Sequence, residues 1–208
     1  AAAYARARSM MLLLGGAATA LGILIGVVVI RNSNRQAGLL QRQAMYDNLT
    51  NLPNRVLFAD RLQQAIRVGR REQRPFALIM MDLNRFKEVN DTLGHSIGDH
   101  LLKSLAARLL AVLQPLGAMP YRLGGDEFAI LLSTVNGLDG AVAATKKILR
   151  SLDEPAEIAR QQIEIGASLG IVLCPEHAEE PEALMRAADA AMYAAKQAHG
   201  GYKVYSKD

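Results

Sequence analysis

Residues 119–132 read MPYRLGGDEFAILL, and this segment specifies the centre of the fold. Two short apolar runs, 119–123 and 128–132, flank the link Gly124-Gly125-Asp126-Glu127. The glycine content of that link is typical of a tight turn between antiparallel strands. We therefore predict a β-hairpin whose turn carries two adjacent carboxylates.

The segments on either side of the hairpin predict an α/β domain. Residues 76–81 (FALIMM) form a continuous apolar run that ends at Asp82, which is typical of a buried strand. An Asp/Thr-rich cap and Pro53 mark a helix start ahead of it. Helices are predicted over 56–71, 98–113, 138–152 and 181–198, and strands over 163–173 and 202–205. This order predicts an α/β (α+β) sandwich with a mixed central sheet of the ferredoxin-like β-α-β-β-α-β type.

Three acidic residues fall where strands end or turn. Asp82 closes the first strand, and Asp126 and Glu127 occupy the hairpin turn. If the two strands are neighbours, the carboxylates converge and repel one another unless a cation lies between them. Hard oxygen ligands select Mg²⁺ or Mn²⁺, and Mg²⁺ completes its shell with phosphate oxygens. The pattern favours a nucleoside triphosphate substrate and phosphoryl or nucleotidyl transfer. The alternative is that these acids are solvated turn residues, and position alone does not decide.

The N-terminal segment predicts a membrane anchor. Residues 10–30 carry no charge and are long enough to span the hydrocarbon core as a helix. The alternative, a secretory signal peptide, has a shorter apolar core and a small-x-small cleavage site, whereas Arg-Asn-Ser-Asn-Arg follows here. Three arginines follow the span and two precede it, which places the C-terminal domain in the cytoplasm.

The residues around the span predict its connections. Residues 1–9 resemble the end of an upstream segment, and we expect an extracytoplasmic sensor before it. Residues 31–45 predict a juxtamembrane linker helix. That helix either pairs with its copy in a dimer or is a solvated linker, since two heptads are too few for a coiled coil.

Charge and cysteine usage exclude other classes of protein. Five of the 24 basic residues and none of the 20 acidic residues lie in residues 1–45, so the remainder is almost neutral. A nucleic-acid platform needs basic charge on the folded domain, and this chain lacks it there. The single cysteine, Cys174, rules out an internal disulfide, and no Cys/His cluster predicts a structural zinc site.

Five motifs together resemble the GGDEF family, the diguanylate cyclases. Leu123–Phe128 (LGGDEF) resembles the family's defining motif. Four further blocks follow the same order as in the family: DNLTNLPNR (47–55), MDLNRFKEVNDTLGHSIGD (81–99), ASLGI (167–171) and ADAAMYAAK (188–196). The resemblance covers residues 46–205 and implies a GGDEF domain over 46–208 with a cyclase-palm core. It also implies the reaction: two GTP molecules form cyclic di-GMP and two pyrophosphates, which requires two domains facing each other as a homodimer.

The resemblance implies roles for individual residues. One or two Mg²⁺ (or Mn²⁺) ions would be held by Asp82, the backbone carbonyl of Leu83, Asp126 and Glu127. Asp126 and Glu127, with Lys87, would be catalytic, and either acid would serve as a general base or only as a metal ligand.

The same resemblance implies a GTP site. Guanine would be recognised by Asn90 and Asp99, because a carboxylate accepts from both N1–H and the exocyclic amine, a donor pair that adenine lacks. The remaining GTP-binding positions would be Phe86, Lys87, Gly124, Gly125 and Lys196, with backbone amides around Phe86 cradling phosphates. For Lys196 the alternative is a solvated helix residue.

Three positions depart from the family pattern. Pro115 and Ala118 stand where many members carry an Arg-x-x-Asp inhibitory site, so we expect no product inhibition through that site. Lys196 is followed by Gln-Ala-His-Gly-Gly, and the usual phosphate-binding arginine is missing there. The ending Val-Tyr-Ser-Lys-Asp resembles the junction to an EAL phosphodiesterase domain.

The sequence therefore predicts an active diguanylate cyclase anchored in the bacterial inner membrane, the signalling output of a membrane-bound receptor. The alternative is a catalytically silent GTP-binding module that regulates an attached or partner domain such as an EAL phosphodiesterase. Asp99 disfavours a third reading, a cyclase that uses adenine nucleotides.

Overall fold

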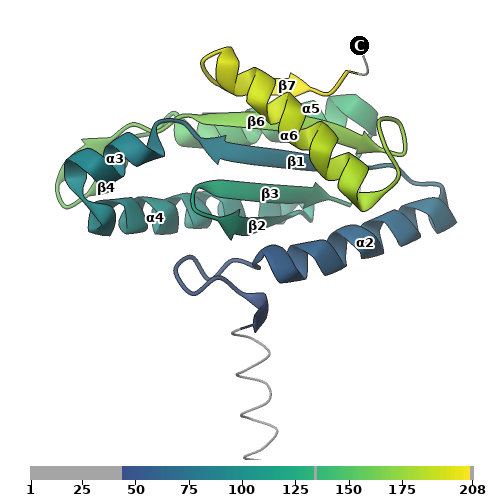
Figure 1. Cartoon of the computed structure of the whole chain (residues 1–208), viewed down its shortest axis with the longest axis horizontal. Coiled ribbons are helices and arrows are strands. Elements are labelled where there is room, and N and C mark those ends of the chain that lie inside the picture. Colours follow the sequence, from purple (N-terminus) through teal and green to yellow (C-terminus); the bar gives the residue numbers. More distant parts are fainter. Residues whose placement is uncertain (1–43, 134, 207–208) are drawn as a thin grey trace, which may run out of the picture. The chain divides into compact units, whose positions relative to one another are not determined.

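The computed structural model describes residues 44–133 and 135–206, which contain a five-stranded sheet in the order β2-β3-β1-β6-β7 (Figure 1). Neighbouring strands run antiparallel except β6 and β7, which are parallel. The mixed sheet and the β-α-β-β-α-β order are confirmed. The strands are β1 (Phe76–Leu83), β2 (Met119–Gly124), β3 (Glu127–Leu132), β6 (Ala167–Cys174) and β7 (Gly201–Val204).

Helices cover both faces of the sheet. On one face lie α2 and α6, and on the other lie α4 and α5 (Figure 1). A short helix, α3, precedes α4, and a single 3₁₀ turn follows it at Gln114–Leu116. The helices are α2 (Arg55–Glu72), α3 (Phe86–Leu93), α4 (His95–Leu113), α5 (Gly137–Leu152) and α6 (Pro181–Gln197).

Strand β1 is buried along its whole length because its alternate residues enter two different cores. Ala77, Ile79 and Met81 pack with α4 and α5, whereas Leu78 and Met80 pack with α2 and α6. Two-sided burial explains why the run FALIMM shows no polar alternation. The same alternation directs Asp82 towards the face that α2 and α6 cover.

One predicted strand is wrong in its first part. Residues 163–173 were expected to be continuous, but β5 (Gln161–Ile163) ends before β6 begins and pairs instead with β4 (Ala156–Ile158). Ala159 and Arg160, both with positive φ, make the turn of this small hairpin. The chain then leaves it through Gly166, whose carbonyl accepts a hydrogen bond from the Asn84 amide at 2.9 Å.

The start of α2 also differs from the expected cap. Asn54 is its N-cap, and the Asn54 side chain accepts hydrogen bonds from the amides of Val56 and Leu57. Asp47 begins a separate turn, and its side chain accepts hydrogen bonds from the backbone amide and the hydroxyl of Thr50 at 2.8 and 2.6 Å. The turn over residues 47–53 is therefore a structural unit ahead of the helix.

Arg122 joins this turn to the hairpin. Its guanidinium donates to Asp47 Oδ1 at 2.8 Å and to the Gly125 carbonyl from both Nε and Nη2, at 3.1 and 2.8 Å. Its backbone amide donates to the Pro53 carbonyl at 2.9 Å. The Arg122 side chain is only 11% exposed, and its bond to Asp47 is partly shielded from water.

Helix α6 lies unusually close to strand β6. A Cβ atom at Gly170 would overlap with the carbonyl oxygen of Ala188 and the amide of Met192. Only a residue without a side chain fits there, so the helix backbone packs directly on the strand. This contact fixes the path of α6 across the sheet.

No helix within residues 44–133 and 135–206 is long and apolar enough to cross a membrane. The predicted span, residues 10–30, and the linker helix up to residue 43 lie outside the described residues.

The ion pair between Asp47 and Arg122 predicts a pH-dependent contribution to stability. Burial raises the pKa of Asp47, but hydrogen bonds from Thr50 and Arg122 outweigh it, and the net shift is downward. Such a group stabilises the fold above the unfolded pKa of about 3.9 and loses that contribution as the pH falls through its folded pKa. Asp47→Asn should therefore lower the free energy of unfolding by about 1.5 to 3 kcal/mol at neutral pH.

Urea denaturation of the wild type and the Asp47→Asn variant, from neutral pH down to about pH 3, checks this. The difference between them should shrink below about pH 4. Asp60→Asn, at an exposed position of α2, is the control and should change stability little. A loss that is equal at every pH would contradict the assignment to this ion pair.

Candidate active site

The register of β1 with β3 brings the predicted acids together. Asp82 lies directly opposite Glu127 across the antiparallel pair, and the amide of Leu83 donates to the carbonyl of Asp126 at 3.4 Å. The end of β1 and the hairpin turn are therefore neighbours, as expected if the three carboxylates converge. Directly opposite residues in such a pair have Cβ atoms about 5 Å apart.

Lys196 of α6 reaches the same place. Its Nζ atom lies 2.6 Å from Oδ1 of Asp82, a residue that is 8% exposed. The hydrogen bond to Asp82 is the main cause of a raised pKa at Lys196, so the ammonium is charged at neutral pH. Asp82 contacts this lysine because its side chain points to the face of the sheet that α6 covers. The close contact at Gly170 holds α6 against that face.

The surroundings of Asp126 disfavour a negative charge on its carboxyl group while Asp82 is also charged. Burial raises the pKa of its carboxyl group, and the charge of Asp82 raises it further. A cation at this position would favour the charged carboxylate and so offset both effects. The turn itself is made by Gly124 and Gly125, whose φ angles of +145° and +53° are unfavourable for residues with side chains.

The donor set fits a magnesium ion that is completed by phosphate. Within the described residues, no group of three or more acidic, His or Cys side chains is arranged to hold a metal by itself. Mg²⁺, however, is usually held by one or two carboxylates together with substrate phosphates. Asp82, the Leu83 carbonyl, Asp126 and Glu127 supply only hard oxygen donors, and Lys196 at present engages one oxygen of Asp82.

Two arginines that sequence reasoning missed hold the hairpin from outside. Arg55, the last residue of the motif DNLTNLPNR, donates to the Leu123 carbonyl at 3.1 Å and lies 3.5 Å from Oε2 of Glu127. Arg122 holds the Gly125 carbonyl, as described above. No local pattern identifies the partner of Arg55, because Arg55 and Leu123 are 68 positions apart.

The loop from β1 to α3 is held by Asn84, another residue that the sequence did not reveal. Its Oδ1 atom accepts a hydrogen bond from Ser168 at 2.7 Å. Gly166 and Gly200 leave room for its Nδ2 atom: a Cβ would lie 3.2 Å from that atom at Gly166 and 2.8 Å from it at Gly200. The loop that leads to Phe86 and Lys87 is thereby hydrogen-bonded to β6 and packs against the turn before β7.

The predicted phosphate and base positions lie on α3 and α4. Phe86 is buried and begins α3, at whose N-terminus no side chain caps the free amides, and Lys87 is exposed in the first turn. Asn90 lies one turn further along α3, against Gly98 of α4, and the exposed Asp99 follows that glycine. The two predicted guanine-binding residues thus come from adjacent, packed helices.

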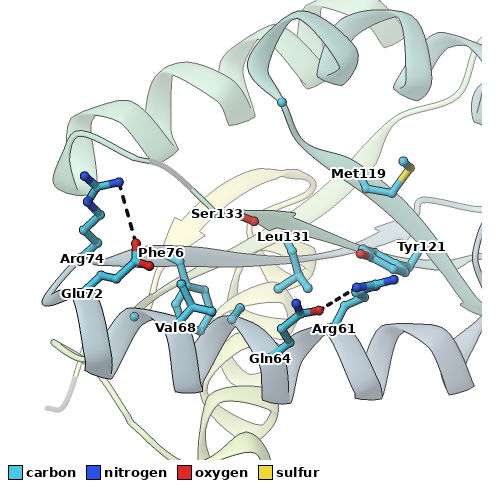
Figure 2. Close-up of a pocket in the computed structure, with 13 residues that line it drawn as sticks. Arg61, Gln64, Val68, Glu72, Arg74, Phe76, Met119, Tyr121, Leu131 and Ser133 are labelled. Carbon is cyan, nitrogen blue, oxygen red and sulfur yellow. Dashed lines mark hydrogen bonds and ion pairs between the residues drawn. The ribbon is translucent and has the colours of Figure 1, made fainter.

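A cavity of about 410 Å³ lies elsewhere, between α2 and the far ends of β2 and β3 (Figure 2). Its lining includes Gly117 and Met119, which flank Ala118, but neither Ala118 nor Pro115. In Figure 2 its guanidinium groups already have partners: Arg61 bonds to Gln64 at 2.6 Å, and Arg74 lies 3.9 Å from Glu72. None of the predicted catalytic or GTP-binding residues lines this cavity.

Comparisons with known proteins identify the family of this chain. Residues 44–201 match the family model described as "Diguanylate cyclase, GGDEF domain". The chain is 43% identical over 174 residues to the bifunctional diguanylate cyclase/cyclic di-GMP phosphodiesterase MucR of Pseudomonas aeruginosa, covering 83% of this chain and 25% of MucR. It is 34% identical over 172 residues to the cyclic di-GMP phosphodiesterase PdeR of Escherichia coli, covering 83% of this chain and 25% of PdeR.

A solved structure has a similar fold and sequence. The crystal structure of the GGDEF domain of TpbB (YfiN) from Pseudomonas aeruginosa superposes with a TM-score of 0.74 at 37% identity, covering 76% of this chain and 99% of that one. The chain spans about a quarter of the length of MucR and of PdeR. With the match over residues 44–201, these likenesses show that the chain belongs to the GGDEF-domain family of diguanylate cyclases.

Proposed function

We propose that this chain is an active diguanylate cyclase that joins two GTP molecules into cyclic di-GMP and releases two pyrophosphates. The observation that carries the proposal is the register that sets Asp82 opposite Glu127, with Asp126 beside them and Lys196 in reach. This arrangement combines carboxylates for a cation with an ammonium for phosphate, as a nucleotidyl transfer needs.

The residues of the site have three roles: they bind metal, phosphate and the guanine base. Asp82, the Leu83 carbonyl, Asp126 and Glu127 would hold Mg²⁺ or Mn²⁺, which when bound activates the attacking hydroxyl and stabilises the leaving pyrophosphate. Lys196 and Lys87 neutralise phosphate charge, and the amides at the start of α3 cradle phosphate oxygens. Asn90 and Asp99 bind the guanine base. Either Asp126 or Glu127 receives the proton of the 3′-hydroxyl, or both act only as metal ligands.

Catalysis also requires a second copy of the domain. One site holds one GTP, and the 3′-hydroxyl of each nucleotide attacks the α-phosphate of the other, so two sites must face each other in a two-fold homodimer. We propose that residues 10–30 anchor the chain in the bacterial inner membrane with the domain in the cytoplasm. A sensor ahead of this chain would then set how the two domains meet.

A second candidate is a silent GTP-binding module that regulates an attached or partner EAL phosphodiesterase domain. One observation favours it: no arginine follows Lys196 in the motif. The two candidates differ in turnover and agree in GTP binding.

The deciding experiment uses residues 44–208 fused to a dimerising coiled coil and incubated with GTP and Mg²⁺. Cyclic di-GMP should form, and the double variant Asp126→Ala, Glu127→Ala should form none, because the cation loses its ligands. Product is measured by chromatography. GTP binding without product in the enforced dimer would favour the silent module.

Lys196→Met should lower kcat/KM for GTP by tenfold or more, because one charge-assisted hydrogen bond to phosphate, worth roughly 1.5 to 3 kcal/mol, is lost. Lys146→Met, at an exposed position of α5, is the matched control and should leave kcat/KM unchanged. Steady-state pyrophosphate release measures both variants. Equal kcat/KM in the Lys196 and Lys146 variants would refute a phosphate-binding role for Lys196.

Product should not inhibit through positions 115 and 118, because neither proline nor alanine offers a side-chain partner for a guanine edge or phosphate. Added cyclic di-GMP should therefore compete only at the GTP site, and higher GTP concentrations should relieve its effect. A variant with Pro115→Arg and Ala118→Asp, which restores the motif, is the positive control. Tight binding of cyclic di-GMP that survives Asp99→Ala would contradict this prediction.

A further inference from the structure

Gly98 is a buried glycine in the first turn of α4, directly before Asp99. A glycine inside a helix costs about 0.5 to 1 kcal/mol relative to alanine. Unlike Gly94, whose φ is +89°, Gly98 is not in the left-handed region, so its backbone conformation does not require glycine. The reason for a glycine at this position must therefore lie in the space that its missing side chain leaves.

That space is filled by the carboxamide of Asn90. A Cβ atom at position 98 would overlap with Oδ1 of Asn90, would lie 3.0 Å from its Cγ, and would lie 3.2 Å from Cζ of Phe86. The backbone of Asn90 is fixed as well, because its carbonyl accepts a hydrogen bond from the Gly94 amide at 2.9 Å. The Asn90 side chain therefore lies directly against the backbone of α4.

We infer that Gly98 is a positioning residue for base recognition, which seats the Asn90 carboxamide next to the helix that carries Asp99. This inference rests on the proposed function, which places the guanine at Asn90 and Asp99. A carboxamide both donates and accepts hydrogen bonds, whereas a carboxylate only accepts. The two groups together present a donor and acceptor pattern that depends on their relative placement.

Alanine at position 98 would disturb that pattern. Its methyl group would push the Asn90 carboxamide away by on the order of 1 Å, because nonbonded heavy atoms pack at about 3.5 Å or more. Hydrogen bonds weaken steeply with such a change in distance and angle. Asp99 stays in place, so the guanine base would still bind the Asp99 carboxylate but would lose the Asn90 carboxamide.

The chain offers a matched control in Gly140 of α5. A Cβ atom there would have its nearest neighbour at 3.7 Å, an ordinary contact. Gly140→Ala therefore reports the general effect of alanine in a helix, without displacing any side chain. Neither Gly98 nor Gly140 contacts a reacting atom in the proposed reaction.

The experiment measures binding by titration calorimetry, with the full chain in detergent. The probes are 3′-deoxyguanosine and 3′-deoxyadenosine triphosphates, which lack the attacking hydroxyl and cannot turn over. The wild type should prefer the guanine nucleotide. Gly98→Ala should weaken guanine-nucleotide binding about tenfold, barely change adenine-nucleotide binding, and so lose that preference, whereas Gly140→Ala should retain it.

A double variant separates positioning from general damage to the fold. If Gly98 acts through Asn90, Asn90→Ala combined with Gly98→Ala should bind no more weakly than Asn90→Ala alone. If Gly98→Ala does not fold, the double variant should still fold, because the overlapping carboxamide is gone. A double variant that also fails to fold, or losses of affinity that simply add, would overturn the inference.

The outcomes also distinguish the inference from the proposed function. Wild-type chain that binds neither nucleotide would refute the GTP site itself. Wild-type chain that prefers guanine, together with a Gly98→Ala variant of equal affinity and preference, would overturn only the role of Gly98.

Discussion

The antiparallel register of β1 against β3 is the constraint on which the site depends. It sets Asp82 opposite Glu127 and leaves Asp82 on the face where α6 brings Lys196. A slip of one residue would turn every side chain of β1 to the opposite face and would separate Asp82 from Lys196. Burial on both faces prevents this, because alternate residues of β1 belong to two cores with different neighbours. Packing along the whole strand therefore determines the position of one carboxylate at its end.

Two arginines extend this control to the hairpin turn. Arg55 and Arg122 bond to successive parts of its backbone, at the carbonyls of Leu123 and Gly125. Arg122 also bonds to Asp47, so the turn over residues 47–53 and the hairpin share one buried guanidinium. If the turn over residues 47–53 moved, Arg122 would therefore move the backbone next to Asp126. The two segments are distant in sequence and adjacent in the fold.

The sequence predicts most elements whose residues carry their own periodicity, although the short helix α3 was not expected. It predicted the strand ending at Asp82, the hairpin, and the helices that became α2, α4, α5 and α6, because each buries a regular apolar face. It failed at residues 163–166, where the change of direction depends on a bond from Asn84 to Gly166, far away in sequence. The long-range contacts Arg55–Leu123, Arg122–Asp47 and Lys196–Asp82 could not be predicted either, since their partners are 68, 75 and 114 positions apart. The acids of the site could be named in advance, but the groups that orient them required the tertiary structure.

The outer edge of β2 is closed to other strands. Along an edge strand, alternate backbone amides point outward and offer donors to any extended chain. In β2 the outward amide of Arg122 is already bonded to the Pro53 carbonyl, and Pro120, two residues earlier, has no amide hydrogen. A neighbouring chain therefore finds no free backbone donor at these two positions. At these positions the edge therefore resists the strand addition that begins aggregation.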